Sequence, residues 1–149
     1  MKVLQTNLKL NTSYNQVNIK FPFTLEEDYE KLIIKFNYSP RLVDKEIAYP
    51  KIIKTIQRDI PKTSKNYQEM MDNAHNMSLE NLITVSLSLN NNFIGSWHNK
   101  SNDQTCIISK DYVTYGFIKT QIVKGNYEVQ LNPHHIGCDI EGSISVEVE

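Results

Sequence analysis

The sequence has little glycine and cysteine and no long apolar run. Its five glycines are scattered singly. A P-loop and a dinucleotide-binding fingerprint both need several glycines close together, so the sequence contains neither motif. Two cysteines are too few for a disulfide scaffold and fit no zinc motif. Cys106 and Cys138 could pair or stay free, and we expect free thiols that serve as small apolar residues.

An excess of charge of one sign is also missing. The formal net charge is −1 and no stripe of lysine or arginine runs along the chain. Nucleic-acid binding is therefore not expected, because a polyanion is attracted by a basic field. No stretch of about 18 apolar residues exists that could span a membrane. Residues 1–7 lack the apolar core of a signal peptide, so we expect a cytoplasmic protein.

The chain does contain apolar and polar residues that alternate with period two, which is typical of strands with one buried face. This pattern predicts strands over residues 4–10, 17–21, 31–38, 82–89, 93–98, 105–109, 117–123, 127–131 and 144–148. Pro22 should either break the strand ladder or lie at a strand edge, and Pro133 and Gly142 should lie between strands. Residues 44–59 instead have isoleucines at spacings near three to four, which indicates a helix, and a weaker helical pattern covers residues 65–76.

A chain of 149 residues fits one domain. Short strands at regular spacing, with turn residues between them, favour two packed antiparallel sheets over a parallel sheet. We therefore predict a single domain over residues 1–149. It should be mainly β, an antiparallel β-sandwich of jelly-roll type, with a short helical insertion around residues 44–76.

Residues that could perform chemistry are few. His134 and His135, as neighbours on a strand, would point to opposite faces, and no histidine belongs to a zinc-binding motif. Together with His98 they are the best candidates for a transition-metal site, which we do not expect. Cys106 and His98 would be the only thiol–imidazole pair, but Cys106 lies in an apolar stretch that suits the core better than a reactive thiolate.

Two further groups of residues could bind an ion or a ligand. Asp139 and Glu141 alternate and could share a face that holds a calcium ion with loop carbonyls, although we expect no metal and no cofactor. Aromatic residues cluster in the second half, where exposed rings could stack on a sugar. The alternative is that Phe93 and Trp97, four residues apart, both fill the core. The candidates for ligand binding are Trp97, His98, Tyr115 and Tyr127.

Several segments resemble a known family. They are Asn-Leu-Ile-Thr-Val-Ser-Leu at residues 81–87, Phe-Ile-Gly-Ser-Trp-His at 93–98, Ile-Val-Lys-Gly-Asn-Tyr-Glu-Val-Gln-Leu at 122–131, Phe-Pro-Phe at 21–23 and the closing strand at 143–149. These segments are similar to the β-sandwich that precedes the catalytic domain in CehA/McbA-type metallohydrolases of the PHP phosphoesterase superfamily. The resemblance spans nearly the full length and implies the sandwich fold.

The chain departs from that family at residues 114–116, where Thr-Tyr-Gly stands in place of Pro-Gly-Tyr. It also ends at Glu149, where the His-x-His-bearing metal domain would begin, so the resemblance implies no hydrolytic site. We expect a module that is not an enzyme and that binds a small molecule or a glycan, or acts beside a separately encoded PHP-type metallohydrolase. Two alternatives stay open: a structural homo-oligomer joined through sheet edges or aromatic faces, and a small metal-dependent hydrolase using His98, His134 or His135.

Overall fold

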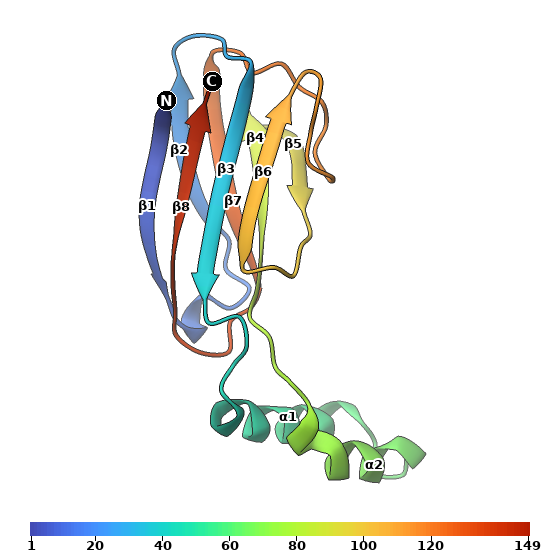
Figure 1. The fold of residues 1–149 in the computed structure, drawn as a ribbon. Coiled ribbons are helices and arrows are strands. Elements are labelled where there is room, and N and C mark those ends of the chain that lie inside the picture. Colours follow the sequence, from blue (N-terminus) through green and yellow to red (C-terminus); the bar gives the residue numbers. More distant parts are fainter.

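Two four-stranded antiparallel sheets face each other in the computed structural model, which describes all of residues 1–149 (Figure 1). Sheet A contains, in spatial order, β1 (Lys2–Leu10), β8 (Ile140–Val148), β3 (Lys31–Ser39) and β6 (Asp103–Ser109). Sheet B contains β2 (Ile19–Leu25), β7 (Gly125–His135), β4 (Leu82–Leu89) and β5 (Asn92–Trp97). A short 3-10 turn, η1 (Thr12–Tyr14), lies in the β1–β2 connection.

The chain passes from one sheet to the other at nearly every connection. Only the β4–β5 hairpin joins neighbours that also follow each other in sequence. The order β1-β8-β3-β6 opposite β2-β7-β4-β5 is that of a jelly roll, which is built from two Greek keys. The predicted antiparallel β-sandwich is therefore confirmed, and β1 and β8 lie side by side although they stand at opposite ends of the sequence (Figure 1).

Where apolar and polar residues alternate in the sequence, their side chains alternate between the core and the outer face of the sheet. On β3 the inward side chains are at most 2% exposed: Leu32, Ile34, Phe36 and Tyr38. Together with the inward residues of the other strands they form one core of 23 buried residues between the sheets. Because each large apolar side chain contributes roughly 1.5–3 kcal/mol when buried, this core is the main source of stability.

The predicted strand over residues 117–123 is wrong. Phe117 and Ile122 are both buried although an odd number of positions separates them, so the segment cannot be a regular strand with one inward face. It makes only isolated bridges, from Phe117 to Gly95 and from Ile122 to Tyr29. The apolar residues of this segment are as frequent as in a strand. Its two buried residues, however, occupy positions that would point to opposite faces of a strand.

The loop over residues 110–124 covers the outer edge of β5 instead. Ser96 N donates a hydrogen bond to Gly116 O at 3.1 Å, and Ile118 N donates to Ile94 O at 2.9 Å. Gly116 has a φ of +96°, and a Cβ atom there would lie 2.1 Å from the Ser96 carbonyl oxygen, so the approach requires glycine. An edge strand with free backbone groups can pair with another chain, and this loop occupies those groups.

Phe93 and Trp97 do not both fill the core as one alternative expected. The β4–β5 pairing shifts register between Leu87 and Ser88, which places Phe93 opposite Ser88 with 64% of its surface exposed. Trp97 lies opposite Val85 and packs against the core. A bulge adds a residue to one strand, and a shift of one residue moves a side chain to the other face.

Pro22, Pro133 and Gly142 all lie inside strands, which is contrary to the prediction for Pro133 and Gly142. Pro22 is on the edge strand β2, as predicted. Pro133 is within β7, opposite Ile83, beside a register shift in the pairing with β4. Gly142 is within β8, where a Cβ atom would lie 2.0 Å from the Asn37 carbonyl oxygen of β3. Gly142 is thus required by the close packing of two strands, and it does not mark a turn.

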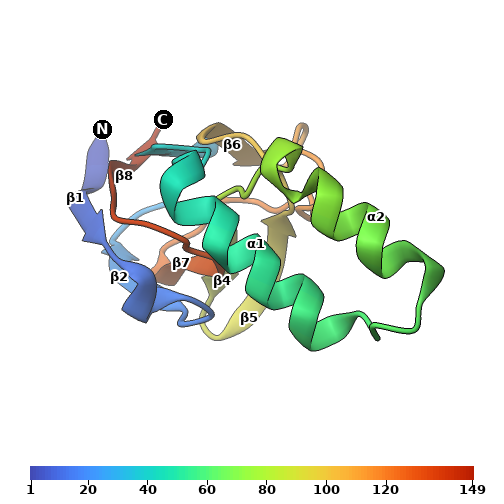
Figure 2. The same ribbon diagram turned by 90° about the horizontal axis from the view of Figure 1, so that it is seen from below.

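The segment between β3 and β4 forms the predicted helical insertion. It contains α1 (Lys45–Asp59), α2 (Lys65–Asn73) and the 3-10 turn η2 (Ala74–Asn76). These helices lie beyond one end of the sandwich, and α1 runs across that end (Figure 1, Figure 2). A small core of their own holds them together, formed by Val43, Ala48, Ile52, Ile56 and Ala74.

Asn81 fastens the insertion to the sandwich. Its side chain is 1% exposed and donates from Nδ2 to Pro40 O at 2.9 Å, where the chain leaves the sandwich. Its Oδ1 accepts from Gly137 N at 2.8 Å, in the β7–β8 connection. The Tyr38 hydroxyl donates to the Asn81 carbonyl oxygen at 3.0 Å. One buried amide therefore joins three segments that are distant in sequence.

Replacing Asn81 by alanine leaves the buried Gly137 N–H without a partner, at about 1–3 kcal/mol, and also removes the bond to the part-buried Pro40 carbonyl oxygen. We expect Asn81→Ala to lower the free energy of unfolding by about 2–4 kcal/mol, measured by urea denaturation with Trp97 fluorescence. Asn18→Ala is the matched control, since Asn18 is exposed, and it should change stability by less than about 0.5 kcal/mol. Equal stability of the two variants would contradict this role for Asn81.

Candidate functional site

The outward side chains of β4 and β7 are polar without exception from Thr84 to Ser88 and from Asn126 to His134. Because Tyr127, Val129 and Leu131 point into the core, the residues between them must point away from it. We call the resulting surface of sheet B the polar face. It consists of Thr84, Ser86, Ser88, Asn126, Glu128, Gln130, Asn132 and His134. Thr84 and Ser86 are themselves buried, at 1% and 7% exposed, so the other six side chains form its accessible part.

Hydrogen bonds hold these side chains in place along the strands. Gln130 Nε2 donates to Asn132 Oδ1 at 2.5 Å. Asn132 Nδ2 lies 3.3 Å from both the Ser86 hydroxyl and the Thr84 carbonyl oxygen. The Thr84 hydroxyl lies 2.9 Å from His134 Nε2. The network leaves polar capacity on the solvent side, because an amide has two donors and two acceptor sites and uses only some of them here.

An open hollow of about 600 Å³ lies over one end of this face. Its lining is almost entirely polar: Lys20, Pro22, Ser88, Asn90, Asn91, Asn126, Tyr127, Glu128 and Gln130. The exposed ring of Phe93 is next to it, since Phe93 is the cross-strand partner of Ser88. Lys20 and Glu128, the two charged residues of the lining, lie 3.7 Å apart as an ion pair. The hollow thus offers amides and a hydroxyl without an unbalanced charge, and the ring of Phe93 lies outside its lining.

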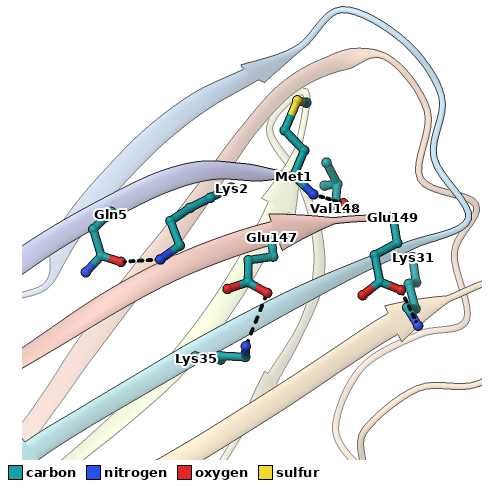
Figure 3. Close-up of polar contacts among 8 residues, drawn as sticks. All are labelled: Met1, Lys2, Gln5, Lys31, Lys35, Glu147, Val148 and Glu149. Atoms are coloured by element: carbon teal, nitrogen blue, oxygen red, sulfur yellow. Dashed lines mark hydrogen bonds and ion pairs between the residues drawn. The ribbon is translucent and has the colours of Figure 1, made fainter.

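The outer face of sheet A has a different chemistry. Lys35 pairs with Glu147 at 3.1 Å and Lys31 with Glu149 at 2.5 Å (Figure 3), and Lys9 lies 3.8 Å from Glu141. The hydrogen bond from Lys31 holds the pKa of Glu149 below its usual value. The charges of this face are satisfied by each other across neighbouring strands, so it has less to offer a ligand than the polar face.

Three of the four ligand-binding candidates gather at the far end of β5. Trp97 is half-buried against the core. His98 is exposed, and its ring centroid lies 5.0 Å from that of His134, edge to face. Tyr115 is 89% exposed and precedes Gly116, which bonds to Ser96 of β5. His98 therefore extends the polar face, and Tyr115 stands beside its edge.

Tyr127 lies apart from this group. It is 1% exposed, and its ring stacks on Phe23 with centroids 5.4 Å apart. Its hydroxyl donates to Val123 O at 2.9 Å, and burial raises its pKa. Tyr127 is among the residues that line the hollow, but its ring is packed in the core and offers almost no surface there.

The groups considered for catalysis and metal binding are spread over the molecule. Cys106 is fully buried on β6, whereas His98 is exposed at the end of β5. His134 approaches His98, but no group of three or more histidine, cysteine, aspartate or glutamate side chains is arranged to hold a metal ion. The calcium candidates Asp139 and Glu141 line one small hollow together with Lys9, whose ammonium competes for the Glu141 carboxylate.

Sequence reasoning concentrated on aromatic residues and missed the polar face. The signal was the polar half of the alternation in β4 and β7, which consists of amides and hydroxyls with one carboxylate, Glu128, and one imidazole, His134. Phe93 was not among the predicted ligand-binding residues. Its exposure depends on the register shift beside Ser88, which no local pattern reveals.

No known protein family and no curated protein matches this chain. The likeness to the sandwich of CehA/McbA-type metallohydrolases therefore rests on the sequence segments alone and stays a prediction. Neither helix has the length and apolar character needed to cross a bilayer.

The two cysteines should differ sharply in reactivity. Both are free, but burial raises the pKa of Cys106 to about 12, so its thiolate is scarce and inaccessible at neutral pH. Iodoacetamide at about pH 8 should modify the half-buried Cys138 and spare Cys106 until denaturant is added. Peptide mass spectrometry locates the label. Labelling of Cys106 in the folded protein as fast as Cys138 would contradict its place in the core.

Proposed function

We propose that this chain is a non-catalytic binding module that takes a neutral, hydroxyl-rich ligand, a glycan above all, on the polar face. The observation that carries the proposal is the hydrogen-bonded row of amides and hydroxyls, with an open hollow and the exposed ring of Phe93 beside it. Sugar hydroxyls both donate and accept hydrogen bonds, as do asparagine and glutamine side chains. The C–H side of a sugar ring packs on an aromatic ring.

The charges support a neutral ligand over an ionic one. Lys20 and Glu128 compensate each other, and the remaining lining consists of uncharged groups. The polar groups are held by neighbouring side chains, so that little side-chain entropy is lost when a ligand binds. This preorganisation distinguishes the polar face from an ordinary solvated surface, whose long side chains move freely.

The resemblance to the sandwich of CehA/McbA-type enzymes adds a partner to the proposal. We propose that a separately encoded PHP-type metallohydrolase acts beside this module, which would bring the enzyme to a ligand that the module holds. Purification of the chain with a PHP-type metallohydrolase that lacks its own sandwich tests this part. Elution of the two proteins as separate species by size-exclusion chromatography would remove the partner and leave the ligand proposal in place.

A glycan array with the purified chain, followed by calorimetry with the neutral oligosaccharide that binds best, tests the ligand. We expect Gln130→Ala and Phe93→Ala each to weaken binding about 10-fold, since each loses roughly the contribution of a hydrogen bond or a ring contact. Gln5→Ala is the matched control, because Gln5 is exposed on β1 of the other sheet. It should leave the affinity unchanged.

Two results would end the proposal. One is an array on which no neutral glycan binds. The other is an affinity that falls equally in Gln130→Ala and in Gln5→Ala, since that would place the contact outside the polar face. Thermal unfolding of each variant shows that a loss of binding reflects the missing side chain and not a loss of fold.

A further inference from the structure

A second cavity, of about 620 Å³, lies where the helical insertion meets the end of the sandwich, and it shares no residue with the polar face. Figure 2 looks onto this end of the molecule. Four parts of the chain line this open cavity: α1, α2 with the residues that follow it, the β1–β2 connection around η1, and the end of β7. Its apolar lining consists of Ile52, Ile56, Met70, Met77, Leu79 and Ile136.

The charged groups of this cavity are all cationic. Lys51, Lys54 and Arg58 line it, and no aspartate or glutamate does. Their spacings of three and four residues place them on one side of α1. Arg58 is neutralised by Asp59, with its Nε 2.7 Å and a terminal nitrogen 3.0 Å from the two carboxylate oxygens. The cavity therefore owes its unbalanced positive charge to the two lysines.

The two lysines differ in what else they bind. Lys51 Nζ donates to Gly137 O at 2.5 Å, so it also supports the β7–β8 connection. Lys54 is exposed and has neither a hydrogen bond nor a carboxylate partner within the chain. A free ammonium beside an apolar wall favours a ligand that supplies an anion and a hydrocarbon surface together.

We propose that this cavity binds a small organic anion with an apolar body, a carboxylate on a hydrocarbon chain. The volume lies within the roughly 300–1,000 Å³ of small-molecule sites. A neutral glycan would leave the partly exposed Met70, Met77 and Leu79 without an apolar partner, and an inorganic anion would leave the same side chains uncovered. Methionine side chains are unbranched and adapt to flexible chains, which suits Met70 and Met77 to such a body.

The walls of the cavity come from both the insertion and the sandwich, so a bound anion ties the two together. Ile136 and Thr12 belong to the sandwich side, whereas Ile52 and Met70 belong to the helices. A ligand that binds only the folded state raises its stability. The thermal unfolding midpoint should therefore rise with ligand concentration.

Calorimetry with octanoate and with 1-octanol tests the proposal on the full chain. We expect octanoate to bind, and Lys54→Gln to weaken octanoate about 5-fold while leaving octanol unchanged, because only the carboxylate needs the ammonium. Lys62→Gln, an exposed lysine of the α1–α2 loop outside the lining, is the control and should change neither affinity. The methyl NMR signals of Met70 and Met77 should shift on addition of octanoate.

Absence of both heat and methyl shifts with octanoate up to about 10 mM would overturn the proposal, since that concentration exceeds the Kd of even a weak specific site. So would an octanoate affinity that is the same in Lys54→Gln as in the original chain. Binding to anionic lipid vesicles without binding of free octanoate would also overturn it, because a membrane surface and not the cavity would then be the partner. A glycan on the polar face should not alter any of these results.

Discussion

The packing of the two sheets against each other is the constraint on which the rest of this structure depends. Each strand places every second side chain into the shared core, and the residues between them are thereby fixed on an outer face. On β7, burial of Tyr127, Val129 and Leu131 determines where the amides of Gln130 and Asn132 point. The chemistry that a ligand can meet is thus a consequence of the core.

Much of the fold could be predicted from sequence because it depends on local periodicity. The alternation in residues 31–38 and 82–89 and the isoleucine spacing in residues 44–59 identified strands and a helix that the structure contains. The strand predicted at residues 117–123 failed because Phe117 and Ile122 reach the core from a turning segment. Jelly-roll strands pair with partners distant in sequence, so register shifts cannot be read from local pattern.

The candidate sites were harder to predict for the same reason. The outward residues of β4 and β7 become one surface only when the two strands pair. The cationic cavity requires α1, the β1–β2 connection and the end of β7 to meet, and in the sequence its lysines are simply the polar side of a helix. The structure therefore separates three surfaces: an ion-paired face on sheet A, a polar face on sheet B whose single carboxylate is ion-paired, and an apolar cavity with a cationic rim.

One core unites both sheets, whereas the helices depend on a small core of their own. Native-state amide hydrogen exchange distinguishes the two. We expect amides of β3, β8, β4 and β7 to exchange with one common free energy, equal to that of global unfolding, and amides of α1 and α2 to exchange with a smaller one. Sheets that exchange with clearly different free energies, or helices as protected as the central strands, would contradict this expectation.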